Sequence, residues 1–140
     1  MTAFDAARAL TESVVLPADA TAARQARALA RSLCIAAGLS ADVQETAVLL
    51  TSEAVTNAVV HGRSLPLLTV SAHPGGVRIC VGDDSSAAIV AQTHDADAQN
   101  GRGIQLLESC ADDWGVYGDG HGGKVVWFEC SEDPRLKPPA

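Results

Sequence analysis

The sequence is poor in aromatic and basic residues. Aromatic side chains make up 4% of its 140 residues, and 10 lysines and arginines stand against 17 aspartates and glutamates. The formal net charge of −7 argues against a general binder of nucleic-acid backbones, because such a protein needs a basic footprint. It does not exclude a mononucleotide site, which is built largely from backbone N–H groups and a metal ion.

The sequence also lacks long apolar runs. None approaches the roughly 20 residues that a membrane-spanning helix needs, and no charged-then-apolar leader stands at the N-terminus. We therefore expect a cytoplasmic protein without membrane contact. A chain of 140 residues has the length of one domain, and it can bury a core without disulfides or metals.

The cysteines show no metal-binding pattern. Cys34, Cys80, Cys110 and Cys130 form no Cys-x-x-Cys pair and have no histidine at ligand spacing. This distribution argues against a zinc site. Because all four lie in apolar surroundings, we expect buried free thiols in a reducing compartment.

Periodicity and turn signals predict two helices in the first half of the chain. A short β-branched strand is expected over 12–16. The first helix begins near Thr21, with Asp19 or Thr21 as its cap, and stops at Gly38. The second is expected over 41–61, with Ser40 as its cap.

The second half of the chain is predicted to be mostly strands. Two strands over 66–84 turn at "HPGG", and two more lie around the glycine-rich turn at 118–123. Between them we expect a long polar loop over 84–100 and a glycine-led helix from 101.

This element order predicts an α+β fold. The helices can cover one face of a mixed, mostly antiparallel sheet, which makes a two-layer α/β sandwich. The domain is expected to span 12–131, between a flexible N-terminus over 1–11 and a flexible tail over 132–140.

Three arginines of the first predicted helix share a face. Arg24, Arg27 and Arg31 lie at helical spacing on its solvated side. Such a stripe most often serves solubility, and less often contacts a partner. The sequence leaves both interpretations open.

The second predicted helix carries a narrow polar line. Glu53, Asn57 and His61 follow one another at i, i+4 and i+8, with Leu49, Leu50 and Val60 on either side. An ionised carboxylate in apolar surroundings must find a partner, raise its pKa or face water. A raised pKa suits a general base, and a carboxamide oxygen suits Mg²⁺. The alternative is a capped or exposed Glu53 and an Asn57 satisfied in the core.

Two further stretches allow nucleotide chemistry. Gly101 to Gly103 opens an apolar helix, whose N-terminal N–H groups and dipole can hold an anion. The alternative is a tight turn at Asn100–Gly101. Asp83, at a strand end, can form a turn, bind a metal or accept a hydrogen bond from an exocyclic amine.

The stretch "GDGHGGKV" comes close to a phosphate-binding P-loop. However, Val125 follows Lys124 where a P-loop needs a hydroxyl residue, and the next residues, "VVWFEC", predict a strand instead of a helix. A hairpin turn is the better interpretation.

In this order, the motifs "SEAVTNAVVHG", "GRGIQLLESCADDWGV" and "GGKVVWFE" resemble the histidine-kinase-type ATPase superfamily with the Bergerat fold. The nearest branch is similar to the small bacterial anti-sigma factor serine/threonine kinases. The resemblance runs from about Ser13 to Cys130.

The resemblance implies roles for individual residues. Glu53 would be the general base, Asn57 would hold Mg²⁺, and Asp83 would accept a hydrogen bond from the adenine amine. Residues 84–100 would form a lid over the nucleotide. The ATP-binding residues that it implies are Asn57, Asp83, Gly101, Arg102, Gly103, Ile104, Gly123 and Lys124.

The resemblance further implies a function, which phosphoryl-transfer chemistry allows. It predicts an ATP- and Mg²⁺-dependent protein serine/threonine kinase that acts on an anti-sigma factor antagonist and sequesters a sigma factor when free. The alternative is a non-catalytic ATP-binding regulator that sequesters a partner such as a sigma factor. Ser85 and Ala87 stand where the family usually has glycines, which favours the alternative. No direct nucleic-acid partner is expected, and the resemblance allows a homodimer.

Overall fold

One antiparallel sheet organises the fold. The computed structural model describes residues 9–61, 65–83, 110–118 and 123–132. In these ranges the sheet has five strands in the order β1-β2-β3-β5-β4, and each neighbouring pair is antiparallel. The strands are β1 (Leu10–Val15), β2 (Leu67–His73), β3 (Gly76–Asp83), β4 (Asp113–Gly118) and β5 (Lys124–Ser131).

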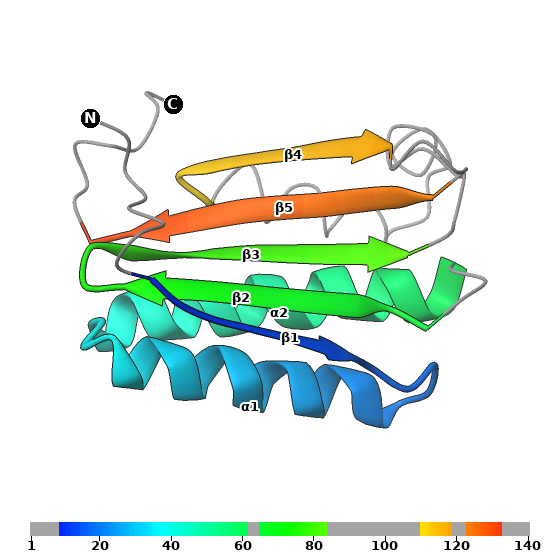
Figure 1. Ribbon diagram of the computed structural model, residues 1–140, viewed down its shortest axis with the longest axis horizontal. Helices are drawn as coiled ribbons and strands as arrows, with labels where there is room; N and C mark the ends of the chain where they lie inside the picture. Colours follow the sequence, from blue (N-terminus) through cyan, green and yellow to red (C-terminus); the bar gives the residue numbers. More distant parts are fainter. Residues whose placement is uncertain (1–8, 62–64, 84–109, 119–122, 133–140) are drawn as a thin grey trace.

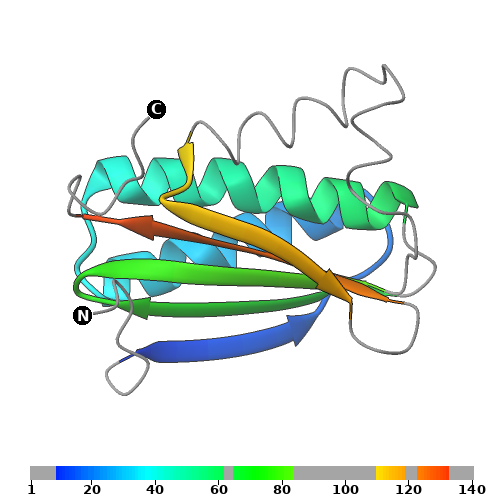
Figure 2. The same cartoon turned by 90° about the horizontal axis from the view of Figure 1, so that it is seen from above.

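Two helices cover one face of this sheet. Helix α1 (Thr21–Ala36) packs against α2 (Ala41–His61) and β2, and α2 packs against β3 and β5. Figures 1 and 2 show both helices on the same side of the strands. The predicted α+β fold, a two-layer α/β sandwich, is confirmed.

Local signals fix the ends of both helices. Gly38 has φ of 77°, a left-handed conformation that favours glycine and ends α1. The Oγ atom of Ser40 accepts the backbone N–H of Val43 at 3.3 Å, so Ser40 caps α2 as predicted. At α1, the Asp19 carboxylate accepts the backbone N–H of Thr21 at 2.8 Å, while the position next to the helix, Ala20, makes no side-chain cap.

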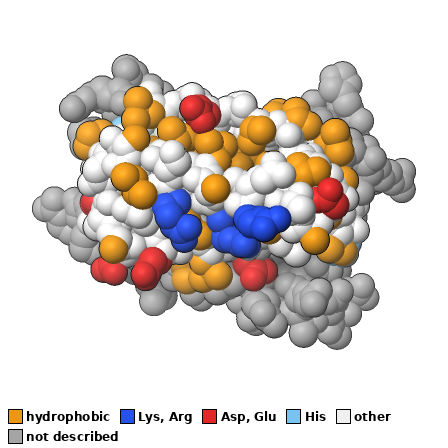
Figure 3. All heavy atoms as spheres, turned by 90° about the horizontal axis from the view of Figure 1, so that it is seen from below, with side chains coloured by type: hydrophobic (Ala, Val, Ile, Leu, Met, Phe, Trp, Pro, Cys, Tyr) orange, Lys and Arg blue, Asp and Glu red, His pale blue; other side chains and the backbone are white. Residues whose placement is uncertain are grey.

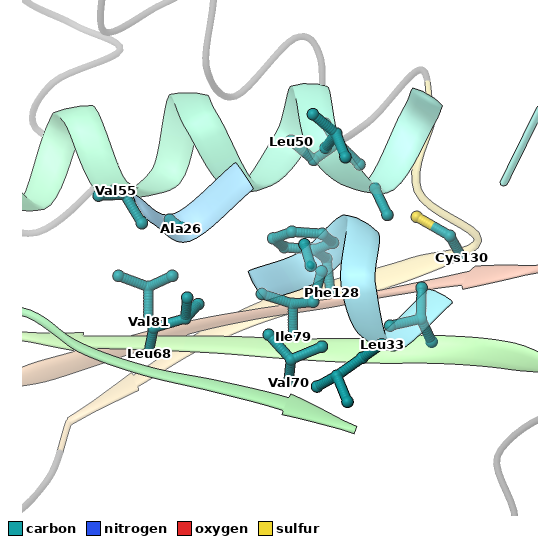
Figure 4. Packing of buried hydrophobic residues seen from close by; sticks show 14 of the residues in the cluster. Ala26, Leu33, Leu50, Val55, Leu68, Val70, Ile79, Val81, Phe128 and Cys130 are labelled. Atoms are coloured by element: carbon teal, nitrogen blue, oxygen red, sulfur yellow. The ribbon is translucent and has the colours of Figure 1, made fainter. Parts of the chain in front are cut away.

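Alternating side chains of the sheet form the core together with the helices. Figure 4 shows Phe128 of β5, Ile79 and Val81 of β3, and Leu68 and Val70 of β2 facing the helix layer. All five are at most 1% exposed. Leu50 of α2, also 1% exposed, packs in the same cluster. Burial on this scale contributes about 1.5–3 kcal/mol for each large side chain.

Strand β1 begins earlier than the predicted 12–16. Leu10 and Thr11 pair with Ala72 and Ser71 of β2, and the hydroxyls of Thr11 and Ser71 lie 2.9 Å apart. The strand is extended by its partner, a non-local effect that local propensity does not report. The strand ends at Val15, and the backbone N–H of the buried Leu16 then bonds the carbonyl of Pro66 at 2.8 Å.

Other predictions fall outside the described residues. These are the loop over 84–100, most of the helix from 101, residues 1–8 of the N-terminal segment and residues 133–140 of the tail. Within the described ranges, neither helix is both long and apolar enough to span a membrane.

Candidate functional site

The polar line of α2 lies on the helix as predicted. Glu53, Asn57 and His61 are all half-buried. Across the described ranges, neither Glu53 nor Asn57 makes a side-chain hydrogen bond or an ion pair. Both groups are therefore available to a ligand, and the described part of the core does not satisfy the Asn57 carboxamide.

The apolar residues beside this line differ in exposure. Leu50 is buried, whereas Leu49 is 43% and Val60 is 62% exposed. Only Leu50 therefore contributes to the core, while the other two lie on the outer surface of the helix layer. The sequence pattern does not separate these cases, because all three are equally apolar.

A second part of the site lies where β3 ends and β5 begins. Asp83 and Lys124 are direct partners in the β3–β5 register. Their exposed fractions are only 8% and 9%. Gly123, next to Lys124, is buried as well. In Figures 1 and 2 the C-terminal end of α2 lies at this same end of the sheet.

Burial governs the electrostatics of Lys124. Desolvation lowers the pKa of its ammonium group, and the neighbouring Asp83 carboxylate opposes that shift by charge attraction. The resemblance implies a nucleotide contact for each of these two residues separately, and their pairing was not predicted from the sequence. Strand register would have revealed it, but the register depends on contacts between distant segments.

The side chains of Asn57 and Glu53 are chemically suited to Mg-ATP. One amide oxygen cannot hold Mg²⁺ alone, but this ion is commonly bound by one or two protein oxygens together with substrate phosphates. The described residues contain no cluster of three or more His, Cys, Asp or Glu side chains that could hold a metal. Asn57 is thus suited to a metal that arrives with the phosphates, and Glu53, one turn earlier, to a proton acceptor.

The predicted phosphate-binding residues cannot be placed. Gly101, Arg102, Gly103 and Ile104 lie outside the described residues. By contrast, the rejection of a P-loop at 118–124 is confirmed, because Lys124 begins a strand and pairs with Gly118 across a hairpin. No helix dipole follows this lysine.

A cavity of about 360 Å³ lies at the other end of the sheet. It is bordered by the start of α2, the end of β5 and the approach to β4, through Ser40, Asp42, Val43, Thr46, Cys110, Asp112, Cys130, Ser131 and Glu132. None of the predicted site residues lines it. The cavity therefore does not include the polar line of α2, Asp83 or Lys124.

The cysteines are free thiols as expected, but only two of the four are buried. Cys34 and Cys130 are buried, and Cys80 and Cys110 are half-buried, all four without a disulfide. Burial raises the pKa of the Cys34 thiol to about 11, and the Glu132 carboxylate adds to that shift.

Comparison with known families identifies the class of protein. A family model described as the histidine kinase-like ATPase domain matches residues 16–130. Since this match covers most of the 140 residues, the chain belongs to the histidine kinase-like ATPase domain family. Membership implies ATP binding. No curated protein matches the chain.

Proposed function

We propose that the protein is an ATP-binding anti-sigma regulatory factor, and that it acts as a Mg²⁺-dependent serine/threonine kinase on an anti-sigma factor antagonist. The carrying observation is the pair on α2: Glu53 and Asn57 lie one turn apart, half-buried, without a side-chain partner among the described residues. Phosphoryl transfer needs mainly positioning and charge neutralisation, which a base, a metal ligand and a phosphate-binding loop can supply.

The roles divide as follows. Glu53 would accept the proton of the attacking hydroxyl, and Asn57 would ligate the Mg²⁺ that neutralises the ATP phosphates. Asp83, at the end of β3, would accept a hydrogen bond from the adenine amine. Gly101 to Ile104 would bind the phosphates, and Gly123 and Lys124 would lie beside the adenine. The protein partners would be the antagonist and a sigma factor.

The second candidate is a regulator that binds ATP and a partner without phosphoryl transfer. The observation favouring it is the sequence after Asp83, where Ser85 and Ala87 replace the usual glycines. A Cβ atom at these positions restricts the backbone, which would weaken nucleotide binding more than the fold.

The first test is the melting temperature with and without Mg-ATP. A ligand at a hundred times its Kd adds about 2.7 kcal/mol to the free energy of unfolding, a rise of several degrees for a domain of this size. The Asn57→Ala variant should lose the Mg²⁺-dependent part of this rise. An unchanged Mg²⁺-dependent affinity in that variant would refute the ligand role.

The second test separates the two candidates by transfer of labelled phosphate to an antagonist. Glu53→Gln should retain the Mg-ATP stabilisation and lose transfer by a factor of about 10²–10⁴. Glu45→Gln is the matched control, because Glu45 is exposed on the same helix outside the polar line. Full transfer by Glu53→Gln would rule out the general base. Absence of transfer by the wild type, with ATP bound, would favour the non-catalytic regulator.

A further inference from the structure

The outer face of the helix layer carries a concentrated positive charge. Arg24, Arg27 and Arg31 lie within an arc of about 60° around α1, at 100° per residue. Figure 3, which views the molecule from the α1 side of Figure 1, shows basic side chains gathered in one group. The remaining described basic residues, Arg78 and Lys124, belong to the sheet.

These arginines have no acidic partner among the described residues. No carboxylate there lies within ion-pair distance of any of the three guanidinium groups. Instead, Nη1 of Arg27 donates a hydrogen bond to Oγ of Ser52 at 3.0 Å. This contact directs Arg27 toward α2, while Arg24 and Arg31 remain exposed. A positive group without internal neutralisation in a chain of net charge −7 is suited to an external anion.

The same face carries exposed apolar side chains. Ile35 of α1 is 58% exposed and lies in line with Arg24 and Arg31. On α2, Leu49, Ser52 and Val60 share one side of the helix, and Ser52 is the residue that Arg27 contacts. The arginine surface is therefore defined by the basic and exposed apolar residues Arg24, Arg27, Arg31, Ile35, Leu49 and Val60.

We propose that the arginine surface docks an acidic amphipathic helix of a partner protein. Arg24 and Arg31 are roughly 10 Å apart along α1, at 1.5 Å per residue, which matches carboxylates at i and i+7 of a second helix. Apolar residues beside and beyond those carboxylates would cover Ile35, Leu49 and Val60. Arginine is suited to this role because its guanidinium binds a carboxylate through two parallel hydrogen bonds.

A protein helix fits this surface better than a nucleic acid. A phosphate backbone needs an extended basic footprint, whereas this surface offers three guanidinium groups between apolar side chains in an acidic chain. The inference deepens the proposed function and rests on it only because that function requires a protein partner. Its α1 residues, Arg24, Arg27, Arg31 and Ile35, lie on another helix than the predicted nucleotide residues Glu53 and Asn57, whereas Leu49 and Val60 flank those two residues on α2.

The test measures binding of a fluorescent 20-residue peptide by anisotropy at low salt. The probe is a designed amphipathic helix with glutamates at i, i+3 and i+7 and leucines beside them. A second peptide replaces each glutamate with glutamine. The acidic peptide should bind the wild type, and the Arg24→Gln/Arg31→Gln double variant should bind it about fivefold more weakly or worse. The glutamine peptide should bind no better to the wild type than to this double variant.

The matched control is Arg78→Gln. Arg78 is an exposed arginine on the opposite face of the sheet, where it pairs with Glu129 at 3.3 Å, and its loss should change peptide affinity less than twofold. An equal loss of binding free energy per removed charge in both variants would reduce the effect to net charge and overturn the proposal. Three other results would also overturn the proposal. They are no binding of the acidic peptide, tighter binding of a 20-nucleotide single strand than of the peptide, and self-association that the double variant abolishes.

The nucleotide readout keeps this test separate from the proposed function. The double variant should retain the full rise in melting temperature with Mg-ATP. If the rise is absent from the wild type as well, the proposed function fails while the peptide result still decides the docking surface. If only the double variant loses the rise, the arginines act on nucleotide binding and the docking proposal is wrong.

Discussion

The buried pair of Asp83 and Lys124 allows a sharp test of the site. Asp83→Asn keeps the shape of the side chain and removes its charge, which leaves Lys124, a residue only 9% exposed, without this charge attraction. Breaking a buried ion pair from one side costs about 3–5 kcal/mol. Because Asp83 and Lys124 lie at the ends of their strands, we expect a cost just below that range, about 2–3 kcal/mol. At this chain length the melting temperature should fall by about 7–10 °C.

The measurement is a double-mutant cycle in urea. Lys124→Met should cost less than Asp83→Asn, because desolvation already disfavours the charged lysine. The double variant should be more stable than the sum of the single effects predicts, with a coupling of about 1–3 kcal/mol. A coupling near zero would refute the idea that the two side chains stabilise each other.

Stability at alkaline pH tests whether the pKa of Lys124 is lowered on folding. The pKa of Lys124 is lowered in the folded protein, so the unfolded chain binds this proton more tightly. The free energy of unfolding should therefore gain a contribution as pH rises from the lowered pKa toward the ordinary value of 10.5. In Asp83→Asn this gain should begin at lower pH, and in Lys124→Met it should be absent.

The same variants distinguish a structural from a binding role of Asp83. If the Asp83 carboxylate accepts a hydrogen bond from the adenine amine, Asp83→Asn loses both stability and the Mg-ATP-dependent rise in melting temperature. If Asp83 serves only Lys124, the variant loses stability but keeps the rise. The second result would remove Asp83 from the proposed nucleotide site without affecting the reasoning about the pair.

Three other perturbations test the packing and the electrostatics of the sheet. Gly76→Ala places a Cβ atom 2.6 Å from the backbone oxygen of Cys130, so it should lower the free energy of unfolding by about 1–3 kcal/mol in urea; an unchanged midpoint would contradict the close approach. Burial raises the pKa of Glu129, with nearby carboxylates adding and Arg78 opposing, so stability falls as pH rises through that pKa. The melting temperature of Glu129→Gln, relative to wild type, should therefore be higher at pH 7 than at pH 4. The reverse order would show that the pKa of Glu129 is not raised on folding. Cys34 is fully buried with a pKa of about 11, so iodoacetamide at pH 8 should modify it only after denaturation, as mass spectrometry can show; labelling of the folded protein at the rate of the half-buried cysteines would contradict this.

Local signals in the sequence were sufficient for most of the fold. Gly38 and Ser40 mark the boundary between the helices through a left-handed backbone and a side-chain cap, both of which depend on neighbouring residues. The start of β1 could not be predicted in the same way. Leu10 and Thr11 become strand residues because β2 offers them partners far along the chain, and single-sequence propensity does not contain that pairing.

In the candidate site, too, local spacing was predictable from the sequence and contacts between distant segments were not. The positions of Glu53 and Asn57 follow from the helical period, so their common side of α2 was predictable from spacing alone. The pairing of Asp83 with Lys124 depends on strand register. The arginine surface was predictable in part. Its arginines share a face of α1 because of their spacing, whereas its apolar residues on α2 join them through the contact of Arg27 with Ser52.

The setting of Lys124 decides what this lysine can do. In a P-loop the lysine extends from a helix N-terminus to a phosphate, but here it begins β5, pairs with Gly118 and is buried beside Asp83. Its ammonium group therefore feels the charge of a neighbouring carboxylate inside the protein. Any effect of Lys124 on nucleotide binding should then act through the position and charge of Asp83. Lys124→Met should therefore change the affinity for ATP only as far as it disturbs Asp83. Added to Asp83→Asn, it should cause no further change in that affinity.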